Sequence, residues 1–280
     1  MTGFTSVSID GVVVEPATAS IPVSDIGFVR GLGVFEVLRG IDSRCFRLEP
    51  HLARLERSAS MLGIELPDQA TIGGWAERAA RQHEDSVVRI LVSAGDLHSP
   101  NTARIVVTSE TLPPAEGAIT LLPLAAPWHS DGEAWELLGG KTLSYANNLA
   151  AVRAATLEGF TDALLMGRSG RILEGPTFSV GWTIEEDGRL IYETPSMALG
   201  ILDSITRQLA FDSAADAELE FREVEVGLDR LDQATEFFAL STLRETTSVT
   251  AVGDRSFPEG PGTAALRTAM QQRTSREMQL

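Results

Sequence analysis

The chain has almost no lysine. Lysine and arginine together number 23, and every one of them except Lys141 is arginine. The two residues serve equally well as solvated surface charges, but a lysine can lose its proton and act as a nucleophile or Schiff-base former, whereas an arginine stays protonated. Lys141 is therefore either a surface residue in an arginine-rich composition or a reactive amine. The residues that accompany it in the sequence decide between these two interpretations.

Cysteine and histidine are also scarce, which limits the kinds of site that the chain can build. The single cysteine, Cys45, excludes an internal disulfide and fits a reducing compartment. In the alternating segment "SRCFRL" it is typical of a strand residue and not of a nucleophile. The four histidines have no metal-ligand spacing, so we expect no metal site. No Gly-x-Ser-x-Gly segment supports serine hydrolysis.

Long apolar runs and a positive charge balance are missing as well. No stretch of about 18 apolar residues occurs, and no basic region followed by an apolar one opens the chain. We therefore expect no membrane span and a cytoplasmic location. The net charge of −16 repels nucleic acid, and no basic patch offsets it. Against this background, a small anionic substrate needs local arginines around its pocket.

The residues that are present form a globular, mixed pattern. A chain of 280 residues, 43% hydrophobic, can bury one large core or two smaller ones. "VSIDGVVVE" predicts a hairpin turning at Asp10-Gly11, and "GVFEVLRGIDSRCFRL" predicts two strands around residues 40–43. Apolar spacing predicts helices over 48–64 and 68–82, and "SVVRILVSAG" and "ARIVVTSE" read as strands. The segment "TLPPAEGAITLLPLAAPW" is the best candidate for a domain boundary.

Beyond this boundary, helices and strands are again mixed. We expect a helix after Lys141, a helix over about 202–215, a short helix before "ATEFFALS", and strands near 162–167, 172–183, 189–193, 218–224 and at "ATEFFALS". Helices and strands do not alternate regularly, so the pattern indicates an α+β fold in two layers and not a βαβ repeat. The Gly-x-Gly of "RGLGVFE" precedes a strand, which is the wrong context for a dinucleotide-binding loop.

The residues that follow Lys141 favour the reactive amine. Tyr145, one of two tyrosines, lies four residues on, and Glu174 in "RILEGPTFS" follows a strand. "DSITRQLA" places Ser204, Ile205 and Thr206 where a helix begins, so that free amides and hydroxyls can hold a phosphate. A second hydroxyl-rich turn lies in "LSTLRE". A lysine, a carboxylate, a hydroxyl donor and a phosphate cup are together what pyridoxal phosphate requires.

Several ordered motifs at matching intervals show a resemblance over nearly the whole chain. They are "SDIGFVRGLGVFEVLR", "FRLEPHLARLERSA", "GGKTLSYANNLAAVRAATLEGFTDALLM", "GRILEGPTFSV", "GILDSITRQLA" and "ATEFFALSTLRETTSV". They resemble the class IV aminotransferases, the fold-type IV pyridoxal phosphate enzymes. That group includes branched-chain aminotransferases, D-amino-acid transaminases, (R)-amine transaminases and aminodeoxychorismate lyase.

The resemblance implies a fold and a cofactor site. The fold is α+β, with a small N-terminal α/β domain (residues 1–116), a linker (117–127) and a larger pseudo-barrel domain (128–280), in a homodimer with the cofactor between the domains. Lys141 forms the aldimine with pyridoxal 5'-phosphate in a ping-pong mechanism, Glu174 pairs with the pyridinium nitrogen, and Tyr145 bonds the ring hydroxyl. The residues implied to bind the phosphate are Arg54, Ser204, Ile205, Thr206, Ser241 and Thr242.

Departures from the family pattern bear on the substrate and on the cup. Arg30 replaces the usual aromatic before "G-x-x-V/F-E", Val87 replaces the tyrosine of branched-chain enzymes, and Ala94 replaces the arginine of the better-known D-amino-acid transaminases. Ser204 and Ser179 replace a glycine and an asparagine, so the cofactor cup departs from the family pattern at these two positions.

Arg30 and Arg89 are the discriminating pair. We expect Arg89 to lie on one buried strand face with Val87 and Leu91. It then either forms a structural ion pair with a carboxylate such as Glu36, or clamps the substrate carboxylate together with Arg30 of the partner subunit. The second reading favours a D-amino-acid:2-oxo-acid transaminase, with 2-oxoglutarate or pyruvate as acceptor. Branched-chain, (R)-amine and aminodeoxychorismate lyase activities remain alternatives. The predicted substrate-binding residues are Arg30, Val87, Arg89, Thr242 and Leu243.

Overall fold

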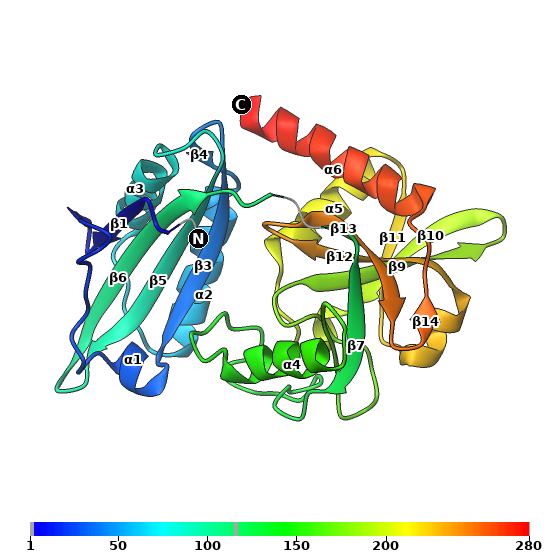
Figure 1. The fold of residues 1–280 in the computed structure, drawn as a ribbon, viewed down its shortest axis with the longest axis horizontal. Helices are drawn as coiled ribbons and strands as arrows, with labels where there is room; N and C mark the ends of the chain where they lie inside the picture. The colour runs from blue at the N-terminus through cyan, green and yellow to red at the C-terminus, as the bar shows by residue number, and fades with distance from the viewer. Residues whose placement is uncertain (1–2, 115–116, 280) are drawn as a thin grey trace. The chain divides into compact units, whose positions relative to one another are not determined.

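The chain folds as two compact units. A computed structural model describes residues 3–114 and 117–279. Unit 1 comprises Met1–Pro114 together with Gly139–Tyr145, and unit 2 comprises Ala115–Leu138 and Ala146–Leu280 (Figure 1). Among the described residues, no helix has both the length and the apolar character that crossing a membrane requires.

Unit 1 is a six-stranded antiparallel sheet with helices on one face (Figure 1). The strand order is β2-β1-β6-β5-β3-β4. The strands are β1 (Ser6–Ile9), β2 (Val12–Val14), β3 (Gly33–Ile41), β4 (Arg44–Cys45), β5 (Ser86–Asp96) and β6 (Ser99–Thr111), and the helices are α1 (Ile26–Arg30), α2 (Leu48–Met61) and α3 (Gln69–Ala80).

Strand alternation decides what each face of this sheet carries. In the register of β3 with β5, Val34 pairs with Val92, Glu36 with Ile90 and Leu38 with Val88. These positions face α2 and α3, and their apolar members are fully buried with Leu55 and Ala76 in one core cluster. Since side chains alternate across a strand, Phe35 and Arg89 lie on the opposite face.

Unit 2 is built on an eight-stranded mixed sheet, in the order β11-β10-β9-β12-β13-β7-β8 with β14 paired to β13. The strands are β7 (Ile119–Ala125), β8 (Asp162–Met166), β9 (Ser179–Glu186), β10 (Arg189–Pro195), β11 (Glu220–Val224), β12 (Ala234–Ser241), β13 (Glu245–Val252) and β14 (Arg255–Ser256). The helices are α4 (Ala146–Leu157), α5 (Ile205–Asp216) and α6 (Pro261–Gln279), with 3-10 helices η1 (Met197–Leu199) and η2 (Leu228–Gln233).

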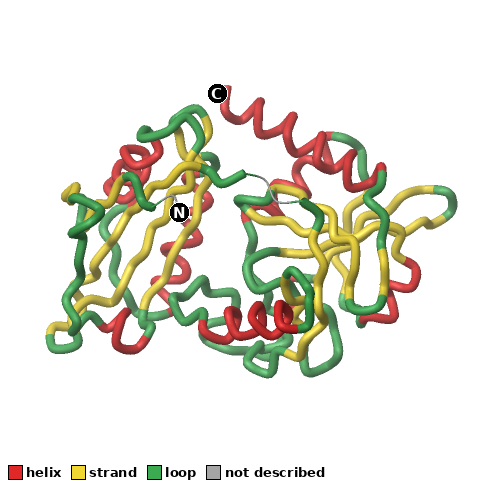
Figure 2. The backbone as a smooth tube through the Cα atoms, in the orientation of Figure 1, coloured by secondary structure: helices red, strands yellow, loops and turns green. Residues whose placement is uncertain are grey.

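The core of unit 2 lies on both faces of this sheet. Trp182 and Phe237 stack with ring centroids 5.8 Å apart in one fully buried cluster. Ala151 and Ala155 of α4 pack against Leu165 of β8 in a second cluster. Residues 126–145, between β7 and α4, contain neither a helix nor a strand (Figure 2).

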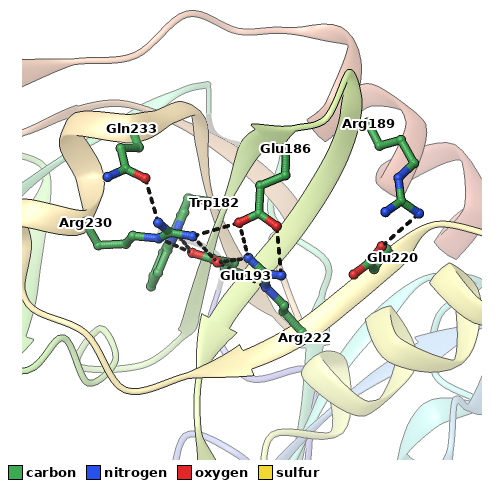
Figure 3. A network of polar contacts seen from close by, with 8 residues as sticks. All are labelled: Trp182, Glu186, Arg189, Glu193, Glu220, Arg222, Arg230 and Gln233. Carbon is green, nitrogen blue, oxygen red and sulfur yellow. Dashed lines mark hydrogen bonds and ion pairs between the residues drawn. The ribbon is translucent and has the colours of Figure 1, made fainter.

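An ion-pair network ties one side of this sheet together (Figure 3). Glu193 of β10 has no exposed surface, and its carboxylate accepts hydrogen bonds from Arg222 of β11, Arg230 of η2 and Trp182 of β9. Glu186 at the end of β9 bonds both arginines. The network therefore joins four elements around one buried negative charge.

Most predicted elements are confirmed. Asp10 and Gly11, with φ of 49° and 82°, turn the β1–β2 hairpin. The helices predicted over 48–64 and 68–82 are α2 and α3, and Cys45 is a buried strand residue in β4. Burial raises the pKa of the Cys45 thiol well above its ordinary value, so this thiol stays protonated.

Three expectations need correction. The segment 117–127, predicted as a linker, contains β7, which pairs in parallel with β8 and β13. Residues 115 and 116, the end of the predicted small domain, lie outside the described residues. The segment carrying Lys141 belongs to unit 1 and not to the larger unit. The strand predicted over 172–183 starts only at Ser179, because Gly175 N–H donates to Phe178 O in a turn.

Candidate active site

Lys141 is held against the edge of β3. Thr142 forms an isolated antiparallel bridge with Val34. Phe35 N–H donates to Lys141 O over 3.0 Å, and Leu143 N–H donates to Gly33 O over 2.8 Å. Lys141 N–H donates to Ser58 Oγ of α2 over 3.1 Å. The segment thus pairs with β3 through a single isolated bridge, and the backbone of the lysine is fixed from two elements.

The amine of Lys141 lies in an aromatic environment. Its Nζ is 4.4 Å from the ring centroid of Phe35 and 5.7 Å from that of Tyr145. The two rings pack edge to face, with centroids 5.1 Å apart. Lys141 is only 9% exposed, which is unusual for a lysine. The surface reading of Lys141 is therefore wrong, and the predicted proximity of Tyr145 is confirmed.

Arg54 belongs to a buried triad on the helix-covered face of the same sheet. Its Nε and Nη2 donate to the two oxygens of Glu36 over 2.7 and 2.6 Å, and His51 Nδ1 lies 2.7 Å from Glu36 Oε2. Burial alone would raise the pKa of Glu36, but the hydrogen bonds and charges of Arg54 and His51 lower it to about 2. Burial lowers the pKa of His51, which favours its neutral form. Arg54 is thus anchored one helical turn before Ser58.

Glu174 is placed by three backbone contacts in unit 2. Its carbonyl oxygen accepts from Leu165 N–H of β8 over 2.9 Å. Leu202 N–H donates to the carboxylate, 3.2 Å from Oε1 and 3.4 Å from Oε2. The carboxylate is therefore oriented from the segment that leads into α5.

His129 also reaches this carboxylate, and the sequence did not indicate it. His129 Nε2 is 3.5 Å from Glu174 Oε1, and the two side chains are 13% and 15% exposed. The residues are 45 positions apart, as their numbers show, so no local pattern marks the pair. Among the described residues, no group of three or more His, Cys, Asp or Glu could hold a metal ion.

The predicted cup residues of α5 lie at its first turn. Ser204 is the N-cap, and its Oγ accepts from Arg207 N–H over 3.2 Å. Ile205 and Thr206 follow, and both are buried. First-turn amides have no intrahelical acceptor, so they can bind an anion. The neighbouring Arg207 is ion-paired with Glu223 and donates to Pro195 O.

The second hydroxyl-rich turn joins β12 to β13. Ser241 Oγ accepts from Arg244 N–H over 3.2 Å and so closes the turn that contains Thr242 and Leu243. The Arg244 guanidinium lies 5.5 Å from the ring centroid of Phe178, which immediately precedes β9. Thr242 and Leu243 are partly exposed, as ligand-contacting residues of a turn can be.

The two arginines predicted to clamp a substrate have different surroundings. Arg30 ends α1, is exposed, and donates to Val29 O over 3.2 Å. Arg89 is ion-paired with Glu110 of β6, with side-chain exposures of 28% and 19%. Val87 is fully buried. The alternative partner Glu36 is ruled out for Arg89, because it lies on the other face of the sheet with Arg54.

Comparisons with known proteins give a consistent family and mixed substrates. The model of the "Amino-transferase class IV" family matches residues 33–252. The chain is 29% identical over 226 residues to a bifunctional aminodeoxychorismate lyase / D-amino acid transaminase of Mycobacterium tuberculosis, covering 74% of this chain and 77% of that one. It is 28% identical to a putative branched-chain-amino-acid aminotransferase of Methanocaldococcus jannaschii, covering 88% of each.

A solved structure supports the fold over the full length. The PLP-bound form of a hypothetical aminotransferase from Mycobacterium tuberculosis matches with a TM-score of 0.90 at 23% identity, covering 98% of this chain and 100% of that one. The predicted α+β fold of type IV is confirmed.

Proposed function

Because this chain belongs to the amino-transferase class IV family, we propose that it transfers an amino group between a D-amino acid and a 2-oxo acid. The observation that best supports a transamination reaction is the buried amine of Lys141 beside Tyr145 and Phe35. The D-amino-acid assignment is supported by the similarity to the bifunctional lyase / D-amino acid transaminase.

The cofactor is pyridoxal 5'-phosphate, and the donor set of the chain fits it. When bound, it supplies an aldehyde that captures an amine and a ring that withdraws electrons from the adjacent carbon. Lys141 offers the amine, Glu174 a carboxylate for the ring nitrogen, and Tyr145 a phenol for the ring hydroxyl. The groups that suit the phosphate are the Arg54 guanidinium, the first-turn amides of Ile205 and Thr206 after Ser204, and the turn hydroxyls of Ser241 and Thr242.

Lys141 has the surroundings of a proton carrier. Its backbone is fixed by β3 and Ser58, so only the flexible side chain has to move. The rings of Phe35 and Tyr145 lie beside Nζ, and a group that moves a proton has to be held within reach of the atoms that give and take it. We assign to Lys141 both the covalent attachment of the cofactor and the movement of the substrate proton.

The substrate carboxylate is assigned to Arg30 and Arg89. Arg30 is exposed on α1. Arg89 already holds the carboxylate of Glu110 in a partly exposed pair, so a substrate carboxylate binds it by taking the place of Glu110. This exchange is possible because exposed ion pairs are worth only about 0–1 kcal/mol. Thr242 and Leu243, which are partly exposed, complete the assigned substrate contacts, whereas Val87 has no exposed surface and is withdrawn from the predicted set.

Amino donors separate this proposal from its alternatives. We expect D-alanine and D-glutamate to react with 2-oxoglutarate faster than L-leucine does.

Arg89→Ala should lower kcat/KM for D-amino acids by a factor of roughly 30 to several thousand, because truncating one partner of a desolvated charge pair costs about 2–5 kcal/mol. Glu110→Gln should lower KM, since it removes the competing carboxylate. The rate with (R)-1-phenylethylamine, which has no carboxylate, serves as control. A preference for L-leucine contradicts the D-amino-acid assignment.

The lyase activity is a second candidate, because the similar bifunctional protein carries both activities in its name. A lyase releases pyruvate from aminodeoxychorismate without a 2-oxo acid acceptor, whereas a transaminase needs the acceptor for every turnover. Pyruvate formed without an acceptor would add this activity to the chain.

A homodimer is part of the proposal. Three apolar side chains near α1 are strongly exposed: Val23 at 83%, Phe28 at 72% and Leu97 at 42%. Exposed apolar clusters next to an arginine are typical of protein–protein interfaces. We assign this surface to the contact through which Arg30 reaches the partner subunit's substrate.

A further inference from the structure

The carboxylate of Glu174 has one side-chain neighbour that the family comparison does not assign. Leu202 N–H reaches both of its oxygens, and His129 Nε2 lies 3.5 Å from Oε1. A backbone N–H and an imidazole therefore hold the carboxylate that is assigned to the cofactor's ring nitrogen.

The loop that carries His129 is itself tied down. Arg168 Nε donates to Pro127 O over 3.1 Å, and Ser169 N–H donates to Asp131 Oδ2 over 2.6 Å. His129 N–H donates to Ala126 O over 2.9 Å. These bonds hold residues 127–131 against the turn that follows β8. The imidazole is thus presented to Glu174 by a fixed backbone.

The other ring nitrogen of His129 indicates its tautomer. His129 Nδ1 is buried and has no hydrogen-bond partner among the described residues. A proton on Nδ1 would leave a buried N–H unsatisfied, which costs more than an unpaired acceptor. The favoured tautomer therefore carries its proton on Nε2, the nitrogen that lies 3.5 Å from Glu174 Oε1.

We propose that His129 is a positioning residue, which holds the Glu174 carboxylate in place for the ring nitrogen of the cofactor. This inference rests on the proposed function, because it acts through Glu174 on the bound cofactor. It concerns the protonation of the ring nitrogen, and thereby the strength of the electron sink, and not the capture of the substrate.

Three variants test the role. His129→Phe keeps an aromatic ring and removes the donor, and His129→Gln restores an N–H at similar reach. Ser130→Ala is the matched control, because it changes the next residue of the same loop, whose buried Oγ has no partner among the described residues. Each holoenzyme is loaded with pyridoxal phosphate labelled with ¹⁵N at the ring nitrogen, and the chemical shift of that nitrogen reports its protonation.

The expected result is specific to the donor. His129→Phe should shift the ¹⁵N resonance toward the unprotonated pyridine and lower kcat about 10- to 100-fold with little change in KM, because the carboxylate loses the side-chain contact that orients it. His129→Gln and Ser130→Ala should stay within about threefold of the wild type.

Two outcomes overturn the inference. An unchanged ¹⁵N shift in His129→Phe would show that Glu174 does not need the imidazole. Equal losses in His129→Phe and Ser130→Ala, with equally lowered melting temperatures, would assign the effect to the folding of the loop. Failure of the wild type to bind the cofactor or to transaminate would instead reject the proposed function, so the two failures are distinguishable.

Discussion

At the scale of single residues, the interior of unit 1 shows how a buried charge is made tolerable. Glu36 has no exposed surface, yet it is the partner of both Arg54 and His51. An ionised carboxylate costs several kcal/mol to bury unless its oxygens are bonded, and here both are. The same bonds hold Arg54, which is assigned to the cofactor's phosphate.

The pKa of Glu36 leads to a prediction about acid stability. Its folded-state pKa of about 2 lies below its ordinary value of 4.5, so the stability from this group is fully present above about pH 4.5 and is lost as the pH falls toward 2. Glu36→Gln should cost roughly 3–5 kcal/mol at neutral pH, because Arg54 loses its buried partner. The difference from the wild type should shrink over that pH window.

Urea unfolding of the cofactor-free protein at a series of pH values measures this effect. Glu110→Gln is the control, because it breaks a partly exposed pair in the same sheet and should cost no more than about 1 kcal/mol. A constant difference between Glu36→Gln and the wild type down to the acid end would mean that Glu36 is not the group that titrates.

Contacts between side chains were predictable where the residues lie close together in the sequence. Lys141 and Tyr145 are four residues apart, and their side chains lie together in the structure. The contact of His129 with Glu174 and that of Arg89 with Glu110 depend on which segments the fold makes neighbours, so neither could be read from spacing. Glu36, named as an example of a partner for a structural ion pair of Arg89, lies on the other face of the sheet, and Arg89 pairs with Glu110 instead.

At the scale of elements, those with a strong local sequence signal were predictable. α2 and the β1–β2 hairpin carry strong local signals, an apolar stripe and an Asp-Gly turn. α1 has five residues, too few for a periodic pattern. It is defined by Asp25, which caps it and also bonds Ser93 and Arg104. The sequence analysis predicts no helix at α6, although α6 begins at Pro261 and buries Leu266, Ala269 and Met270.

The ion-pair network of unit 2 joins several elements, and its contribution to the stability of the protein can be measured (Figure 3). The bonds of Arg222, Arg230 and Trp182 to the buried Glu193 carboxylate join β9, β10, β11 and η2. Although burial favours the protonated form, the bonds from Arg230 and Arg222 lower the pKa of Glu193. Glu193→Gln should therefore destabilise the protein by about 2–3 kcal/mol at neutral pH.

The neighbouring pair of Arg189 with Glu220 provides the comparison, because its side chains are 71% and 47% exposed. Arg189→Ala should change the free energy of unfolding by less than about 0.5 kcal/mol. Thermal unfolding of the two variants side by side decides the matter. Equal melting temperatures of the two variants would show that the network contributes no more to the stability of the protein than an exposed ion pair does.

At the scale of the whole molecule, the place of Lys141 depends on the chain crossing between units. The chain leaves unit 1 after Pro114, returns at Gly139 with the Lys141 segment, and leaves again after Tyr145. The sequence indicates one domain boundary and gives no sign of this return to unit 1. The return depends on the pairing of Thr142 with Val34, which are more than 100 positions apart. Neither unit is complete as a continuous stretch of chain.

Complementation between subunits tests the proposed dimer. Arg30 and the exposed side chains of Val23 and Phe28 belong to one surface around α1, whereas Lys141 is buried. If Arg30 acts in the partner subunit's site, an Arg30→Ala subunit and a Lys141→Ala subunit each retain what the other lacks. Both parent homodimers should be nearly inactive with D-amino acids, and Lys141→Ala should fall below about a thousandth of wild-type turnover, because it removes a covalent and proton-moving group.

Mixed dimers should regain one intact site of the two. Unfolding and refolding the two variants together in equal amounts gives half of the molecules as mixed dimers, so we expect about a quarter of wild-type activity, by random pairing of subunits. The control is the same treatment of each variant alone, which should give no recovery. If Arg30 instead serves the site of its own chain, the mixed dimer has one site without Arg30 and one without Lys141, and activity stays at the level of the parents. That result would remove Arg30 from the partner's site while leaving the role of Lys141 intact.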